Sequence, residues 1–568
     1  MFNSLPQDAQ DFMQWSWDQI EPYFQHLAQR PLHAANVSQW LADWSLLQSL
    51  IAETYSRLAI ATTVNTQDEE AERQYRLFLD EIFPNAQAAD QALKEKLVAS
   101  GLQPNGFDMP LRNMRAEIEV FRAENLPLLA EEMKLGIEYD KITGAQSVNW
   151  EGEERTVPQM RAVLEDPDRA RRERGWRLTL TRQLQDREAL GDLWGRLLNV
   201  RRQVAENAEL PDYRAYQWRV MHRFDYSPED CRTFQDAIEN AVVPVVERLN
   251  VKRRRQLGVD ALRPWDVDVD PFQRPALQPA DSAAELEAGV ARIFHQVDPR
   301  LGEYFEIMRR EQLLDLDNRK NKAPGGYCTN LDVAERPFIF MNAVGIHDDV
   351  QTLLHEGGHA FHVFETSHLP YLPQRMAPME FAEVASMSME LLAAPYLTSA
   401  QGGFYTQEEA ARAVIAHLEA SLRFWPYMAV VDAFQHWVYE NPQAALDPAN
   451  CDQTWGELWQ RFMPGVDWSG LEDEMVTGWQ RKGHIFQAPF YYVEYGLAQL
   501  GALQVWRNAL SDQAQAVRDY RRALALGGAA PLPQLFETAG ARFAFDAETL
   551  GAMAALAERQ IEALENQL

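Results

Sequence analysis

The chain has few cysteines and few long apolar runs. It contains three cysteines in 568 residues, Cys231, Cys328 and Cys451, and no C-x-x-C pair. This excludes a disulfide framework and favours a reducing compartment, so we predict a cytoplasmic protein. The most apolar stretch, residues 411–434, still contains arginine and glutamate side chains. Such a stretch is too polar for a membrane span, and we predict none.

Positive charge is also scarce. Lys and Arg total 54 against 84 Asp and Glu, which leaves a formal net charge of −30. A surface this acidic repels nucleic-acid backbones and anionic membranes, so we predict neither partner. The excess serves mainly solubility, with a screened attraction for cationic groups. Because 46% of the residues are hydrophobic, the chain has enough apolar surface to form a large core and is not disordered.

Most of the sequence has helical periodicity. Apolar residues recur three and four positions apart in many segments, among them residues 37–60, 110–130 and nearly everything after residue 348. Residues 147–153 read as a short hairpin or loop, and residues 325–330 and 337–342 read as two strands joined by a turn. The predicted fold class is therefore mostly α, with a small sheet.

One motif carries metal chemistry: His355-Glu356-Gly357-Gly358-His359. Asp348 and Gln351 resemble a capping box that would start a helix just before it. Four residues apart on a helix, His355 and His359 share a face, and two imidazole nitrogens suit Zn²⁺. Glu356 lies about 100° round the helix, where its carboxylate reaches a metal-bound water as a general base.

A catalytic zinc site needs a third protein ligand and one open position. His362 shares the face of His355, but its axial offset of about 10 Å prevents convergence on one ion. Glu365 stands where a longer zinc motif would place histidine. Beyond a proline-containing loop, a second helix carries three further candidates, which spacing alone does not rank: Glu380, Glu383 and Glu390.

Several segments together resemble the thimet oligopeptidase and oligoendopeptidase F family of zinc peptidases, and within it the oligoendopeptidase F and Pz-peptidase branch. The segments that carry the resemblance are residues 225–231, 262–266, 326–342, 349–362, 381–386 and 484–495. The resemblance covers about residues 195–560. Residues before about 190 match the family only in being helical.

The resemblance implies that His355, His359 and Glu383 hold one zinc ion and that Glu356 is the base. It places an oxyanion- and substrate-binding histidine at His484 and the accompanying tyrosines at Tyr492 and Tyr495. Tyr491 stays an alternative, because the spacing from His484 is one residue shorter than in the thimet branch. Without the resemblance, this aromatic stretch would be interpreted as core packing. Glu390 could orient a ligating imidazole.

The family also implies a two-lobed helical peptidase around a deep substrate channel, with a gluzincin-type H-E-x-x-H helix near residues 349–366 and a small sheet beside the active site. We expect an N-terminal helical lobe over residues 1–190 and a catalytic region over residues 191–568. The predicted function is zinc-dependent cleavage of internal bonds in short peptides. The alternatives are a zinc carboxypeptidase or dipeptidyl carboxypeptidase of similar fold, and a peptide-binding protein or helical scaffold without turnover. The oligomeric state is open.

Overall fold

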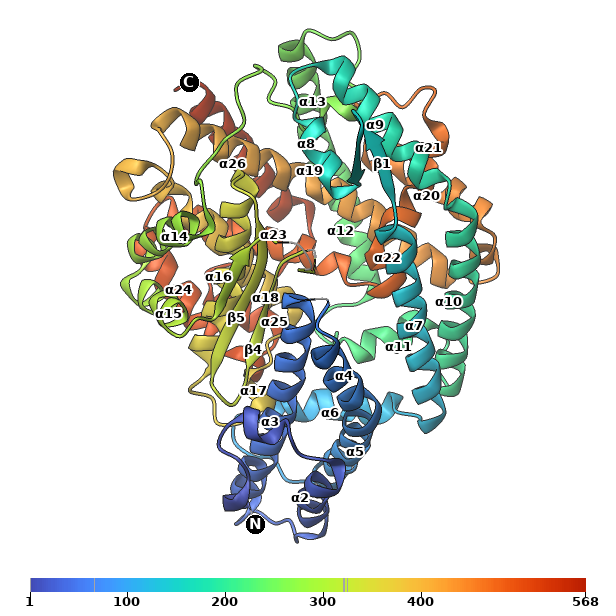
Figure 1. The fold of residues 1–568 in the computed structure, drawn as a ribbon, viewed down its shortest axis with the longest axis vertical. Coiled ribbons are helices and arrows are strands. Elements are labelled where there is room, and N and C mark those ends of the chain that lie inside the picture. Colours follow the sequence, from blue (N-terminus) through green and yellow to red (C-terminus); the bar gives the residue numbers. More distant parts are fainter. Residues whose placement is uncertain (1, 66, 320–321, 324) are drawn as a thin grey trace. The chain divides into compact units, whose positions relative to one another are not determined.

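The computed structural model describes residues 2–65, 67–319, 322–323 and 325–568 (Figure 1). Helices dominate, and the described strands form one two-stranded and one three-stranded sheet. The predicted mostly-α fold class is therefore confirmed. None of the helices in the described residues is long and apolar enough to cross a membrane.

The chain divides into two compact units that are interleaved along the sequence. Unit 1 comprises residues 1–119, 277–413 and 498–543, and unit 2 comprises residues 120–276, 414–497 and 544–568. Among the described helices, α19 (Gln407–Glu440) and α23 (Tyr492–Ala509) run from one unit into the other, and α6 (Asp108–Val120) has its last residue in unit 2. The division predicted at residue 190 and the predicted channel stay predictions.

Unit 1 contains the H-E-x-x-H helix and the three-stranded sheet. Its elements are α1 (Ala9–Phe12), α2 (Trp17–Gln29), α3 (Val37–Val64), α4 (Glu69–Leu77), α5 (Phe83–Ala99), α6 (Asp108–Val120), α14 (Ala283–Val297), α15 (Pro299–Arg310), β3 (Leu314–Asp317), β4 (Tyr327–Leu331), β5 (Arg336–Ala343), α16 (His347–Thr366), α17 (Leu372–Arg375), α18 (Met379–Ala393), α24 (Gln513–Leu524) and α25 (Leu532–Thr538).

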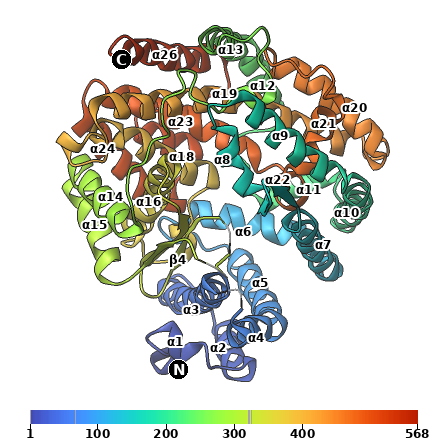
Figure 2. The ribbon, with the colours of Figure 1, turned by 45° about the horizontal axis from the view of Figure 1, so that its top comes forward.

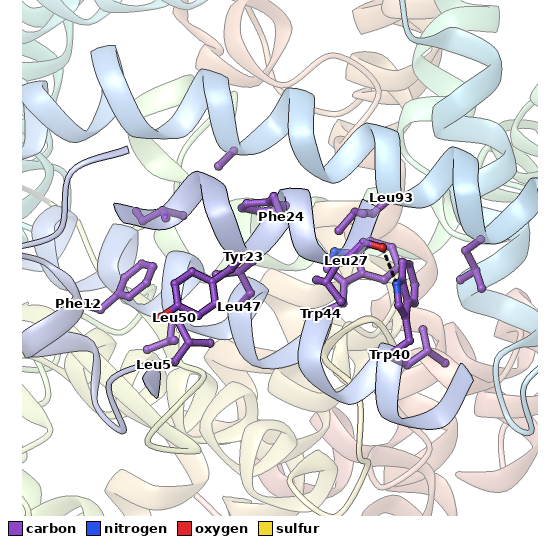
Figure 3. Packing of buried hydrophobic residues seen from close by; sticks show 14 of the residues in the cluster. Leu5, Phe12, Tyr23, Phe24, Leu27, Trp40, Trp44, Leu47, Leu50 and Leu93 are labelled. Carbon is purple, nitrogen blue, oxygen red and sulfur yellow. Dashed lines mark hydrogen bonds between the residues drawn. The ribbon is translucent and has the colours of Figure 1, made fainter. Parts of the chain in front are cut away.

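The N-terminal helices of unit 1 enclose an aromatic core of their own, shown in Figure 3. Trp40 and Trp44, one turn apart on α3, are almost fully buried. The Trp40 indole donates a hydrogen bond to the backbone carbonyl of Leu27 at 3.0 Å, which satisfies its only polar group (Figure 3). This core joins α2, α3 and α5.

The three-stranded sheet confirms the predicted β region and adds a strand. β5 lies in the middle, antiparallel to β4 and parallel to β3. The register pairs Tyr327 with Phe340 and Leu331 with Arg336. β4 is thus an edge strand, and α16 packs against both β4 and β5.

Unit 2 contains the other sheet, whose strands form the predicted short hairpin. Its elements are α7 (Leu126–Gly144), β1 (Ser147–Trp150), β2 (Glu153–Thr156), α8 (Arg161–Leu164), α9 (Arg169–Leu184), α10 (Arg187–Asn207), α11 (Tyr213–Val220), α12 (Pro228–Ala241), α13 (Val243–Leu257), α20 (Pro448–Phe462), α21 (Glu472–Val476), α22 (Gly483–Gln487) and α26 (Ala547–Glu565).

The single helix predicted over residues 110–130 is wrong. The structure has α6 ending at Val120 and α7 beginning at Leu126, with a 3₁₀ turn between them. Pro127 explains the break, because proline lacks an N–H group and is tolerated in the first turn of a helix rather than in its interior. The apolar periodicity on either side of it hid the interruption.

Two helices of unit 1, α16 and α18, lie side by side (Figures 1 and 2). They pack closely enough to exclude a side chain between them at Gly358. A Cβ atom added at Gly358 of α16 would lie 2.6 Å from the Ala385 carbonyl oxygen and 2.6 Å from the Ser386 Cα of α18. Both obstacles are backbone atoms, so no side chain can rotate away to make room. The glycine therefore sets how closely these two helices approach.

We expect Gly358→Ala to lower the free energy of unfolding by about 1–3 kcal/mol, the usual cost of overpacking a close contact. Gly195→Ala is the matched control, because a Cβ atom there meets nothing within 4 Å on the same type of element, in the middle of α10. The control should gain up to about 1 kcal/mol from helix propensity. Denaturant unfolding measures both, and equal stability of the two variants would contradict the close-approach argument.

Candidate metal centre and active site

The helix that carries the motif begins with a carboxylate cap. The Asp349 Oδ2 atom accepts hydrogen bonds from the backbone N–H groups of Val344, Gly345 and Ile346, at 2.8, 2.6 and 3.0 Å. The capping box predicted at Asp348 and Gln351 is wrong, because α16 already begins at His347. The loop folds back at Gly345, whose φ of +86° favours glycine, and so presents three N–H groups to one carboxylate.

The two histidines of the motif and Glu383 of α18 converge. The Glu383 Oε2 atom lies 3.5 Å from His355 Nε2 and 3.7 Å from His359 Nε2. Zinc bonds of about 2.1 Å at tetrahedral angles separate neighbouring ligand atoms by about 3.4 Å, so these separations suit one ion. One donor atom from each of the three residues lies within 4.8 Å of the others. The donor set, two imidazoles and a carboxylate, fits the zinc ion that the sequence predicts.

Charge and burial keep two of the three donors, Glu383 and His359, in the state that binds a cation. Burial alone would raise the pKa of Glu383, but the hydrogen bond from His355 and the charges of both imidazoles lower it to about 2. Burial lowers the pKa of His359 to about 4, so this imidazole is neutral at pH 7. Metal ligands must be deprotonated, and Glu383 and His359 meet that condition. His355, whose pKa is raised, would release a proton when a metal binds.

A second carboxylate of α18 orients His355. The Glu390 Oε1 atom lies 2.7 Å from His355 Nδ1. A carboxylate there holds the proton on Nδ1 and turns Nε2 toward Glu383, as outer partners of ligating histidines do. Glu383 and Glu390 together raise the pKa of His355 well above its usual value, against the opposing effect of burial. The role predicted for Glu390 from its helical spacing agrees with this contact.

Glu356 lies next to this group without belonging to it. Its side chain is buried, and burial, together with the charges of Glu383 and Glu390, raises its pKa to about 7 although the charge of His355 opposes the shift. The backbone N–H of Cys328, near this carboxylate, also opposes the shift, as the smallest of these causes. A carboxyl group with a pKa near 7 can both take and return a proton, which is what a general base that later acts as an acid requires.

Sequence reasoning missed Cys328. The residue lies on the edge strand β4, and both its main-chain N–H and its thiol interact electrostatically with the Glu356 carboxylate. Burial and the charge of Glu356 raise the pKa of the Cys328 thiol well above its usual value. The sequence did predict the strand that contains Cys328. Which residue of that strand lies beside Glu356 depends on how β4 packs against α16.

His484 lies in unit 2 with all three candidate tyrosines. Its ring centroid is 6.1 Å from that of Tyr491, 5.1 Å from that of Tyr492 and 5.9 Å from that of Tyr495. Tyr492 is 5% exposed, and the other three rings are half-buried. The structure brings the predicted residues together as one cluster and does not separate Tyr491 from the other two. This cluster belongs to unit 2, whereas the metal centre belongs to unit 1.

Comparison with known proteins decides the family. The model of peptidase family M3 matches residues 162–555, and the model of the peptidase M3 N-terminal domain matches residues 10–105. The chain belongs to peptidase family M3. The second match extends the family likeness to residues 10–105. In that part of the chain the sequence had shown only a helical pattern.

Relatives within the M3 family agree with the predicted branch. The chain is 24% identical to the oligopeptidase PepF of Bacillus subtilis over 289 residues, which is 50% of this chain and 41% of the relative. It is 31% identical to an oligoendopeptidase F homolog of Mycoplasma pneumoniae over 141 residues, 24% of this chain and 22% of the relative. The matched segments thus span less than half the length of these curated relatives.

Solved structures match the M3 chain over its whole length. The structure of Pz peptidase A with an inhibitor superposes with a TM-score of 0.90, at 28% identity and 100% coverage of both chains. A second structure, provisionally named oligoendopeptidase F, gives a TM-score of 0.88 at 28% identity, covering 99% of this chain and 98% of the other. The predicted recognition of the family is confirmed.

The other ligand candidates of this M3 chain lie outside the three-donor group. Glu365 forms an ion pair with Arg521 at 2.7 Å. His362 is buried with its ring against Phe381, and burial lowers its pKa to about 3. Glu380 is buried on α18 but does not join the group. The geometry therefore separates Glu383 from the alternatives that spacing left open.

One further buried group in the described residues has metal-ligand chemistry: Cys231, Asp432 and His436. Arg214 donates a hydrogen bond to His436 Nδ1 at 3.3 Å, which leaves the proton on Nε2 and no free lone pair there. Gln235 donates to Asp432 Oδ2 at 2.6 Å. We interpret this group as a polar network within the core of unit 2.

Removal of the third donor should remove the metal. We expect Glu383→Ala to purify with little or no bound metal, because two imidazoles alone bind an ion far more weakly than three ligands. Glu365→Ala is the matched control, a half-buried glutamate that pairs with Arg521 instead. Elemental analysis of both purified variants measures their metal content. If Glu383→Ala retained its metal and Glu365→Ala lost it, Glu365 rather than Glu383 would be the third ligand.

The Glu390 contact predicts a graded effect on metal affinity. Glu390→Ala should weaken binding about 10–100-fold, because His355 loses the acceptor that orients it. Glu390→Gln keeps an acceptor oxygen and should lose less. Competition titration with a chelator measures both affinities. Identical affinities for the wild-type protein and Glu390→Ala would show that this hydrogen bond does not orient the ligand.

Proposed function

We propose that this chain is a zinc-dependent oligoendopeptidase that hydrolyses internal peptide bonds of short peptides. The observation that supports it is the convergence of His355, His359 and Glu383, with Glu356 buried beside them at a raised pKa. Membership of family M3 and the likeness to Pz peptidase A and oligoendopeptidase F support the same reaction class. The small number of cysteines, three in 568 residues, supports a reducing compartment, and we place the protein in the cytoplasm.

In the proposed site His355, His359 and Glu383 hold one zinc ion, which polarises the scissile carbonyl and lowers the pKa of water when bound. Glu356 takes a proton from the attacking water as the water oxygen bonds to the carbonyl carbon. When the C–N bond breaks, Glu356 returns that proton to the leaving amine.

The carbonyl oxygen gains negative charge in this reaction and needs a hydrogen-bond donor. On the family resemblance we assign that role, together with substrate binding, to His484, Tyr492 and Tyr495. Their mutual packing in unit 2 supports a common role, because one histidine ring contacts both tyrosine rings. Tyr491 contacts the same ring and stays the alternative donor.

The base assignment is tested on an internally quenched peptide blocked at both ends. The wild-type protein should cleave it, and Glu356→Gln should lose about 10²–10⁴-fold in kcat while retaining its metal. The control is Glu408→Gln, an exposed glutamate in α19 that should leave kcat unchanged. Full activity of Glu356→Gln would refute the base assignment.

The same substrate separates the alternative functions. A carboxypeptidase or dipeptidyl carboxypeptidase requires a free C-terminus and would leave the blocked peptide intact. A peptide-binding protein would leave every peptide intact, with or without added zinc. Mapping the cleaved bond by mass spectrometry therefore decides between internal cleavage and these two outcomes.

A further inference from the structure

Glu53 places a buried carboxylate at the turn between β4 and β5. It lies in the middle of α3, and only 1% of the residue is exposed. Its Oε2 atom accepts hydrogen bonds from the backbone N–H groups of Val333 and Ala334, at 2.7 and 2.9 Å. Arg57, one turn further along α3, donates to the Oε1 atom at 2.8 Å. Both carboxylate oxygens are therefore hydrogen-bonded, which stabilises their charge away from water.

The same helix contacts β4 through two more polar side chains (Figure 1). The Thr63 hydroxyl lies 2.6 Å from the Tyr327 hydroxyl. The Ser56 hydroxyl lies 3.4 Å from that of Thr329. Tyr327 and Thr329 share one face of the strand, whereas Cys328 between them points to the other face, where its thiol interacts with a carboxylate of α16. β4 is thus held between α3 and α16.

The register shows which backbone groups of β4 point away from β5. Residues along an antiparallel strand alternate between facing the partner strand and facing away from it. Ile339, the partner of Cys328, donates its N–H to Leu313 on the other side of β5, so the N–H and C=O groups of Cys328 point away from β5. Those of Asn330 point the same way, because its partner Pro337 has no N–H to donate. These groups lie on the open edge of the sheet.

An open strand edge can pair with the backbone of an extended peptide. Cys328 on this edge lies beside Glu356, so a peptide paired with β4 would pass next to the proposed base. The position of the edge therefore affects both binding and the approach of the scissile bond. Among the described contacts, the two hydrogen bonds to Glu53 fix the turn that ends β4.

Stability alone does not account for a charge at this turn. Burial, and then the charge of Glu53, raise the pKa of Asp332 in the same turn to about 6, although Arg375 opposes the shift. A buried carboxylate close to a second carboxylate costs free energy, which a neutral acceptor at the turn would avoid. The ionised form offers stronger and more directional hydrogen bonds to the two N–H groups, and so a more exact placement of the strand.

We propose that Glu53 is a positioning residue for substrate binding, which holds the β4–β5 turn so that the open edge of β4 pairs with the backbone of the peptide. The inference rests on the proposed peptidase function. Glu53 belongs to the N-terminal helical segment, residues 10–105. That segment therefore contributes to peptide affinity through β4.

The test uses blocked, internally quenched peptides in which one residue at a time near the cleaved bond is N-methylated. Methylation removes a backbone donor, so at a residue that pairs with β4 it should raise the KM of the wild-type protein about fivefold, and at the next residue, whose N–H points away, much less. Glu53→Gln keeps the shape of the side chain and loses the charge. Its KM for the unmethylated peptide should rise about fivefold with kcat within about twofold, and its methylation penalty should shrink.

Asp90 of α5 supplies the matched control. Its carboxylate also accepts two hydrogen bonds within the N-terminal helices, from Trp44 at 2.7 Å and Gln48 at 2.9 Å. Asp90→Asn should lower stability and leave KM unchanged, and an equal rise of KM in both variants would overturn the positioning role. If Glu53→Gln does not fold, Thr63→Val takes its place, since it removes only a hydroxyl contact to β4. Wild-type KM and methylation penalty in that variant would also overturn the proposal.

The positioning role and the proposed function fail separately. If the wild-type protein cleaves the peptides and the methylation penalty is the same in Glu53→Gln, the positioning role is wrong and the peptidase function stands. If the wild-type protein cleaves no blocked peptide with zinc present, the proposed function is wrong and the positioning role is overturned with it.

Discussion

The buried carboxylate of Glu383 is the group on which the candidate site depends. It is 4% exposed and lies against two imidazole nitrogens, with the Ser386 hydroxyl as a further donor at 3.1 Å. An ionised carboxylate away from water costs several kcal/mol unless it is paired and hydrogen-bonded. Here the pairing requires α16 and α18 to be close, which Gly358 permits because it has no Cβ. The close packing of α16 and α18 is thus also what allows the charge of Glu383 to be balanced by the two histidines.

Three carboxylates surround the two imidazoles, and burial, with a smaller contribution from this excess of negative charge, explains the raised pKa of Glu356. Glu383 is held ionised by the histidines, and Glu390 pairs with His355. Glu356, with less compensation and deep burial, has its pKa raised to about 7. A divalent cation among the three donors would offset the same excess. The arrangement is therefore consistent both with a metal site and with a base that exchanges its proton near neutral pH.

The aromatic cluster of unit 2 shows how a cation is accommodated without a counter-ion. Lys482 contacts two tyrosine faces and one hydroxyl, whereas the acidic side chains that dominate the composition are absent from its described surroundings. The cluster is polar at its donors and apolar over its rings.

Local pattern was sufficient for much of the molecule. Periodicity predicted the helical class, and local composition predicted the hairpin or loop at residues 147–153 and the β4–β5 pair, because these depend on neighbours in the sequence. It missed the break at Pro127 and the true start of α16, since both depend on where a short loop turns rather than on apolar spacing.

For the site, the sequence by itself determined that His355 and His359 share a helix face with Glu356 beside them, because four residues make about one helical turn. Spacing left Glu380, Glu383 and Glu390 equivalent, and the family resemblance favoured Glu383. Only the tertiary structure brought the Glu383 carboxylate between the imidazoles, turned Glu390 to the far nitrogen of His355 and aimed the Cys328 N–H at Glu356. These contacts join segments far apart in the chain, and their geometry arises from helix–helix and helix–sheet packing, which no local periodicity contains.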